Sequence, residues 1–99
     1  MKIWVDDVRP APEGYVWSTS VALTIGLVAG YESSGQIIEL IDLDHDAGDY
    51  ARLGGDYIKI LDWFEKTGRS YPIRIHSQNP VGVQNMRAII QRNGWTEVK

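Results

Sequence analysis

The 99-residue sequence has no cysteine, and no run of apolar residues approaches the roughly 20 that cross a bilayer. Without cysteine, disulfides, thiolate metal sites and cysteine nucleophiles are excluded, so any metal ligands must be oxygen or imidazole. The chain reaches Asp6 and Asp7 before the apolar stretch of a signal peptide could form. We therefore expect a cytoplasmic protein without membrane association.

The sequence also lacks an excess of positive charge, since its formal net charge is −3 at pH 7. Surfaces that bind nucleic acid by counterion release are usually basic, so we expect no broad surface of this kind. Contact with one nucleotide or one RNA end stays open. The glycine motifs of P-loops, dinucleotide-binding folds and serine hydrolases are absent as well.

The residues that are present favour one folded domain over residues 1–99, because 43% of them are hydrophobic and 23% are charged. Strand and helix patterns alternate along the chain. The patterns predict strands at 2–5, 15–17, 37–43, 72–75 and 95–98, and helices at 19–29, 55–66 and 80–93.

This alternation predicts the α/β class, as a small three-layer sandwich with a mostly parallel sheet and helices on both faces. The segment 37–43 is almost continuously aliphatic, which is typical of a central parallel strand. The helix at 80–93 has the clearest signals, with a capping Asn79 before Pro80 and a terminating Gly94. Its expected buried residues are Val83, Met86, Ile89 and Ile90.

Three of the expected strands are followed by polar clusters, which begin at Asp6, Asp44 and His76. Ligands of parallel sheets bind beyond the carboxyl ends of the strands, where these clusters would meet. Crowded carboxylates repel one another unless a cation neutralises them, so Asp6, Asp7 and Asp44 are candidate ligands of Mg²⁺, Mn²⁺ or Ca²⁺. Alternatively, Asp6 and Asp7 cap a turn.

The residues around this acidic cluster add candidate groups for catalysis and phosphate binding. His45 and His76 are general acid–base or ligand candidates, or are hydrogen-bonded structural residues. Ser77, Asn79 and Arg9 are candidate phosphate donors, although Asn79 can serve only as a helix cap and Arg9 only as a solvated side chain. Two tyrosines near a Gly-Gly pair, Tyr50 and Tyr57, are either core residues or stacking partners for a base.

With these residues in view, the chain resembles response-regulator receiver domains, and more closely the small family of cyclic-phosphate-processing receiver domains. The resemblance rests on four segments, which are Trp4-Val5-Asp6-Asp7-Val8-Arg9-Pro10, Leu43-Asp44-His45-Asp46, Gly55-Asp56-Tyr57 and Ile75-His76-Ser77-Gln78-Asn79-Pro80-Val81-Gly82. It implies a reduced receiver (flavodoxin-like) topology, one strand–helix unit short.

The resemblance also implies roles for individual residues. In receivers, side chains at the positions of Asp6, Asp7 and Asp44 bind Mg²⁺, the last accepts a phosphoryl group, and a hydroxyl at the position of Ser77 contacts it. The receiver lysine has no clear counterpart in this sequence. The closer family implies His45 and His76 as additional site residues, and it implies RNA repair through processing of phosphate ends or cyclic phosphates.

Two functions therefore stay open at this point. The preferred hypothesis is a metal-dependent phosphoesterase or cyclic-phosphate (RNA-end) processing domain, with Asp44, His45 and His76 as catalytic residues and a phosphorylated small molecule or RNA end as its substrate. The alternative is a non-enzymatic module that binds a cation and phosphate, or that accepts a phosphoryl group on Asp44 and switches a partner protein. Neither hypothesis decides whether the chain forms a homodimer.

Overall fold

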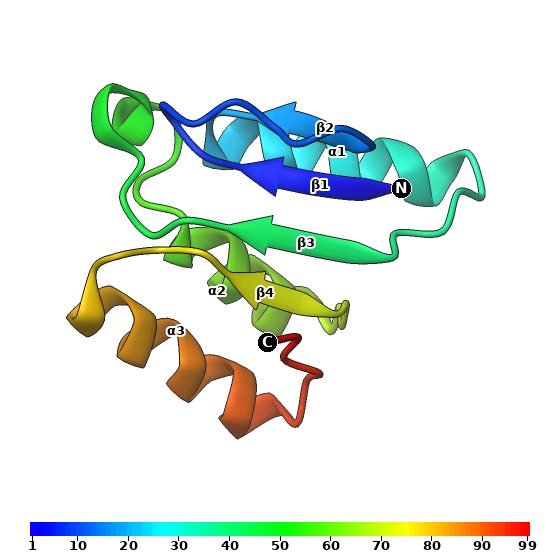
Figure 1. Cartoon of the computed structure of the whole chain (residues 1–99). Coiled ribbons are helices and arrows are strands. Elements are labelled where there is room, and N and C mark those ends of the chain that lie inside the picture. Colours follow the sequence, from blue (N-terminus) through cyan, green and yellow to red (C-terminus); the bar gives the residue numbers. More distant parts are fainter.

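The computed structural model describes residues 1–99 and has one four-stranded sheet (Figure 1). The strands lie in the order β2-β1-β3-β4, and every neighbouring pair is parallel. Their bounds are Lys2–Val5 for β1, Tyr15–Ser18 for β2, Leu40–Leu43 for β3 and Ile73–Ile75 for β4. The α/β class, the parallel sheet and the reduced receiver topology are thus confirmed.

Three α-helices and one 3₁₀-helix follow the strands. Ser20 begins α1 by accepting a hydrogen bond from the Leu23 backbone N–H at 3.0 Å, and Asn79 begins α3 by accepting one from Gly82 at 3.0 Å. None of the helices combines the length and the hydropathy that a transmembrane span requires. The bounds are Val21–Ser33 for α1, Gly48–Leu53 for the 3₁₀-helix η1, Ile58–Thr67 for α2 and Pro80–Asn93 for α3.

The hydrophobic core lies on one face of the sheet, where side chains from all three helices meet those of the strands. The fully buried hydrophobic strand residues on this face are Ile3, Val5, Ile41, Leu43 and Ile73. The alternate strand residues point to the other face, and none of them belongs to the core cluster. In Figure 1, α1 and α2 both lie behind the sheet.

The predicted helix layer on the second face is therefore missing, and the molecule has two layers. The connections from β2 to β3 and from β3 to β4 cross the sheet in the same direction. Right-handed crossovers in one direction place their helices on one face. The connection from β1 to β2 runs the opposite way, but residues 6–14 form a loop there, because Pro10 and Pro12 disfavour a helix.

Other predicted bounds shift for local reasons. The central strand starts at Leu40 instead of residue 37, and Ile37 is 78% exposed, because β1 begins only at Lys2 and leaves residues 37–39 without a neighbouring strand. The first predicted helix continues through Gly30 to Ser33. The predicted closing strand is reduced to one bridge between Ile73 and Glu97.

The last two helices also refine the prediction. The middle helix begins at Ile58, three residues later than predicted, because the chain first makes a turn at Gly54 and Gly55, which both have positive φ. The bounds of α3 agree with the prediction, including the cap at Asn79 and the left-handed Gly94 at φ 67°. Val83, which the sequence pattern predicts to be buried, is partly exposed, and Gly82 is buried instead.

Candidate functional site

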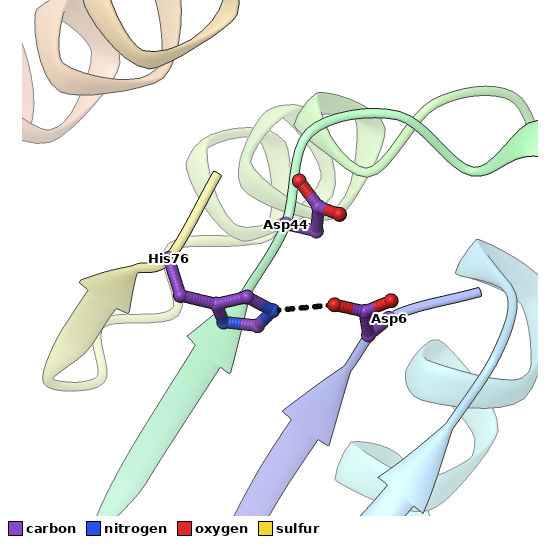
Figure 2. A group of neighbouring side chains, drawn as sticks. All are labelled: Asp6, Asp44 and His76. Atoms are coloured by element: carbon purple, nitrogen blue, oxygen red, sulfur yellow. Dashed lines mark hydrogen bonds and ion pairs between the residues drawn. The ribbon is translucent and has the colours of Figure 1, made fainter. Parts of the chain in front are cut away.

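The parallel sheet brings three predicted site residues together at its carboxyl edge, as Figure 2 shows. Asp6 directly follows β1, Asp44 directly follows β3, and His76 directly follows β4. One oxygen or nitrogen atom from each lies within 4.8 Å of the others. Two carboxylates and an imidazole at such distances can hold a divalent cation.

Asp6 is the most firmly held of the three, and its side chain is 1% exposed. Its Oδ1 accepts hydrogen bonds from the backbone N–H groups of Val8 at 2.9 Å and Arg9 at 2.8 Å, and its Oδ2 lies 2.9 Å from His76 Nε2. Burial raises the pKa of Asp6, but these backbone donors and His76 outweigh burial, so the pKa is lowered overall. Asp6 therefore caps the turn after β1, as the alternative predicts, and also belongs to the cluster with Asp44 and His76.

His76 lies between two carboxylates. Its Nδ1 is 2.7 Å from Asp42 Oδ1, opposite the contact of its Nε2 with Asp6. The ring stacks on the Trp4 indole with a centroid distance of 3.8 Å and an interplanar angle of 4°. With 9% of its side chain exposed, His76 is fixed in both position and orientation.

Asp42 was not among the predicted site residues. It lies within β3, its side chain is fully buried, and its Oδ2 has no hydrogen bond, although Arg74 Nη1 is 3.5 Å away. The sequence does carry a signal for it, since Asp42 is a lone acid between Ile41 and Leu43. Alternate residues of a strand point to opposite faces, so an acid between two core residues lies on the face of the sheet opposite to the core.

Arg9 supplies positive charge to this cluster. Its Nε lies 3.3 Å from Asp6 Oδ2, its Nη2 lies 3.7 Å from Asp44 Oδ2, and the same nitrogen donates to the His76 carbonyl oxygen at 3.4 Å. The guanidinium therefore serves as counter-ion of the carboxylates. Because 47% of the side chain is exposed, the Arg9 guanidinium is reachable from solvent while its partner Asp6 is buried.

Asp7 lies beside the cluster without joining its set of ligand atoms. Its carboxylate packs against Gly48, where any larger residue would collide with it. The pKa of Asp7 is raised, first by burial and then by the negative charges of Asp6 and Asp44. The three acids of the predicted metal site are thus close enough to repel one another.

His45 belongs to a different group, formed with Asp46 and Asp56. Its Nδ1 lies 2.8 Å from Asp46 Oδ1, and its ring packs against Gly82 at the start of α3. Asp56 accepts a hydrogen bond from the Ala47 backbone N–H at 2.9 Å. The structure therefore separates the two histidines, which the sequence alone placed around one pocket.

The predicted phosphate donors of the last segment lie at the beginning of α3. Ser77 Oγ accepts a hydrogen bond from the Asn79 backbone N–H at 3.1 Å, and the Asn79 amide nitrogen is 3.4 Å from the carboxylate of Asp46. Both side chains thus stabilise the local turn and helix cap, and the Ser77 hydroxyl keeps its proton available as a donor.

The two tyrosines near Gly54 and Gly55 pack in or against the hydrophobic core. Tyr57 is fully buried and its hydroxyl donates to the Thr19 carbonyl oxygen at 2.8 Å, so it is not available to a base. Burial raises the pKa of this hydroxyl first of all. Tyr50 is half-buried against the core cluster.

Comparison with known families agrees with this arrangement. The model of the family described as the cyclic-phosphate processing receiver domain matches residues 1–92. The chain belongs to this family. The resemblance predicted from the sequence is thereby confirmed, and the strand-end residues of this cyclic-phosphate processing receiver domain all lie within the matched range. No curated protein and no solved structure matches the chain.

Proposed function

We propose that this domain converts a phosphoester or a cyclic phosphate, such as that of an RNA end, with a divalent cation bound at Asp6 and Asp44. The observation that carries this proposal is the convergence of Asp6, Asp44 and His76 within 4.8 Å at the carboxyl edge of a sheet from this family. The pKa of Asp7, raised first by burial and then by the charges of Asp6 and Asp44, supports it, because a bound cation would relieve the repulsion among the three acids.

Asp6 and Asp44 would hold the cation, and it would supply Lewis acidity to a phosphoryl oxygen and to a bound water. Asp6 is already oriented for binding by its two backbone donors. Arg9 leaves the carboxylates when a cation neutralises them, and then contacts the substrate phosphate. The Ser77 hydroxyl donates a hydrogen bond to the same phosphate. His45 or His76 transfers a proton to or from the reacting oxygen.

Turnover of nucleoside 2′,3′-cyclic phosphates tests the proposal, measured with Mg²⁺ or Mn²⁺ on wild type and on Asp44→Asn. We expect Asp44→Asn to lose at least ~10²-fold in turnover while keeping the fold. Glu65→Gln is the matched control, since it changes one carboxylate of the same molecule far from the site, and it should keep full turnover. Full turnover in Asp44→Asn, His45→Ala and His76→Ala alike would refute the proposal.

A second candidate function is a phosphoryl-accepting switch. It is favoured by Asp44 itself, because the Oδ2 atom makes only the ion pair with Arg9 and is free to attack a phosphoryl group. Incubation with acetyl phosphate and Mg²⁺, followed by intact mass measurement, distinguishes the two. A stable adduct in wild type that is absent from Asp44→Asn supports the switch, whereas steady release of phosphate supports turnover.

A further inference from the structure

Asp42, the buried partner of His76, has no part in the proposed function as stated, and His76 appears there as one of two alternative proton carriers. We propose that Asp42 is a positioning residue that makes His76 Nε2 a third ligand of the cation, so that the site favours a transition-metal ion over Mg²⁺. This inference rests on the proposed function, because it concerns the cation site formed by Asp6 and Asp44.

The first step of the argument is the hydrogen bond between the two side chains. An ionised carboxylate only accepts hydrogen bonds, so the 2.7 Å contact with Asp42 Oδ1 places a proton on His76 Nδ1. Nε2 points the opposite way and makes the same kind of contact with Asp6 Oδ2 at 2.9 Å, which a bound cation would replace. Nε2 would then give any proton it carries to solvent and offer its lone pair to the cation, while the hydrogen bond to Asp42 stays.

Such a carboxylate is the usual outer partner of a metal-bound histidine. It fixes the tautomer, orients the ring and makes the ligand nitrogen more basic. The Trp4 indole, stacked at 3.8 Å, prevents the His76 ring from tilting away. The hydrogen bond to Asp42 and the stacking on Trp4 together fix the position of His76 Nε2 relative to Asp6.

The second step is the energetic cost of Asp42. A fully buried carboxylate with one oxygen lacking a hydrogen bond destabilises a fold unless a partner compensates for it. Arg74 lies 3.5 Å away and 48% exposed, so it compensates only in part. The one hydrogen bond of the Asp42 carboxylate is the contact with His76 Nδ1, so the histidine is the partner that the buried charge acts on.

The third step is the identity of the ion. Two carboxylates and one imidazole nitrogen form a mixed oxygen and nitrogen donor set. Mg²⁺ binds almost exclusively to oxygen, whereas Mn²⁺ and Zn²⁺ also accept imidazole. The site should therefore bind Mn²⁺ or Zn²⁺ more tightly than Mg²⁺.

Calorimetric titration of the full chain with Mn²⁺ and with Mg²⁺ tests the inference on wild type, Asp42→Asn, His76→Ala and the double variant. We expect Asp42→Asn to weaken Mn²⁺ binding by roughly 10–100-fold and Mg²⁺ binding by much less. His76→Ala should lose a similar amount, and the double variant should lose no more than His76→Ala alone, because the two residues act as one unit. Glu65→Gln is the control and should bind as wild type does.

The possible outcomes separate the two proposals. If Mn²⁺ does not bind wild type, the cation site of the proposed function is refuted. If Mn²⁺ binds wild type and Asp42→Asn equally while His76→Ala loses affinity, the site stands and the role of Asp42 is refuted. Should Asp42→Asn not fold, ¹⁵N NMR of the Zn²⁺-loaded wild type decides, since the inference requires a proton on His76 Nδ1 and none on Nε2.

Discussion

Two groups of carboxylates in this molecule have opposite electrostatic surroundings. On the helical side, each of Glu32, Glu65 and Glu97 has its own arginine, at N···O distances of 2.9 Å for Arg69, 2.9 Å for Arg92 and 2.7 Å for Arg87. At the carboxyl edge of the sheet, Asp6, Asp7 and Asp44 have Arg9 as their only arginine, and it contacts two of them.

The difference appears in the pKa values. The arginine hydrogen bonds lower the pKa of Glu32, Glu65 and Glu97. At the carboxyl edge of the sheet, burial and the neighbouring carboxylates raise the pKa of Asp7, whereas, despite burial, backbone donors and His76 lower that of Asp6. Paired acids stabilise the fold in which they occur. The ionised form of Asp7, which has no arginine of its own, lowers the stability of the fold, and this is the pattern expected where a cation is to be bound.

The largest effect should come from supplying that cation. A ligand at ~100 times its dissociation constant stabilises the folded state by about 2.7 kcal/mol, which is a shift of several degrees in Tm for a chain of this size. We expect such a shift for wild type with Mn²⁺ and its loss in Asp6→Asn and Asp44→Asn. Thermal unfolding monitored by circular dichroism measures it.

The paired acids provide the control for this experiment. Glu65→Gln should leave the cation-induced shift intact, because that carboxylate already has Arg92 and Asn93 as partners. If Glu65→Gln reduced the shift as much as Asp44→Asn, the cation would be binding to acidic side chains in general, and the contrast between the two groups would have no functional meaning.

A smaller effect of opposite sign should come from Asp7→Asn. Without a cation, this substitution removes a charge that Asp6 and Asp44 repel, and we expect it to stabilise the fold at neutral pH by about 0.5–1 kcal/mol. It should also reduce the Mn²⁺-induced shift, because the substitution removes part of the negative potential. Asp7→Asn would thus raise the stability of the cation-free protein and lower its affinity for the cation.

The pH dependence of this gain follows from the direction of the pKa shift. Because the pKa of Asp7 is raised in the folded protein, its ionised form destabilises the fold, and this cost disappears as the pH falls through the raised pKa toward the ordinary value of 3.8. The advantage of Asp7→Asn should therefore be present at pH 7 and absent near that ordinary value. An advantage that persisted in acid would have to come from packing instead of charge.

The strand-end cluster could be predicted from the sequence because each of its residues directly follows a strand pattern in the chain. A strand pattern followed by an acid places that acid at the carboxyl edge, and parallel strands bring such edges together, so Asp6, Asp44 and His76 needed no knowledge of the strand order. Their contacts with one another and with Arg9 depend on that order and could not be predicted.

Asp42 and the open face of the sheet were missed for a related reason. The aliphatic pattern of segment 37–43 predicts a strand covered on both faces, which leaves no role for an acid within it. The strand order and the handedness of the crossovers leave one face without helices, and on that face Asp42 contacts His76, which directly follows the neighbouring strand β4. The separation of His45 from His76 likewise depends on the packing of His45 against Gly82 in α3.

The smallest effect should come from breaking a paired acid. Arg87 makes two-pronged contact with Glu97, in the tail whose residue 97 bridges to Ile73 of β4. The Arg87 side chain is 36% exposed and the pair is screened by solvent, so Arg87→Ala should cost up to about 1 kcal/mol, less in high salt. Thermal unfolding at low and high salt measures this cost. Because Arg87 lies far from the acidic cluster, the Mn²⁺-induced shift should stay as in wild type, and a reduced shift would show that the two groups of carboxylates are coupled through the sheet.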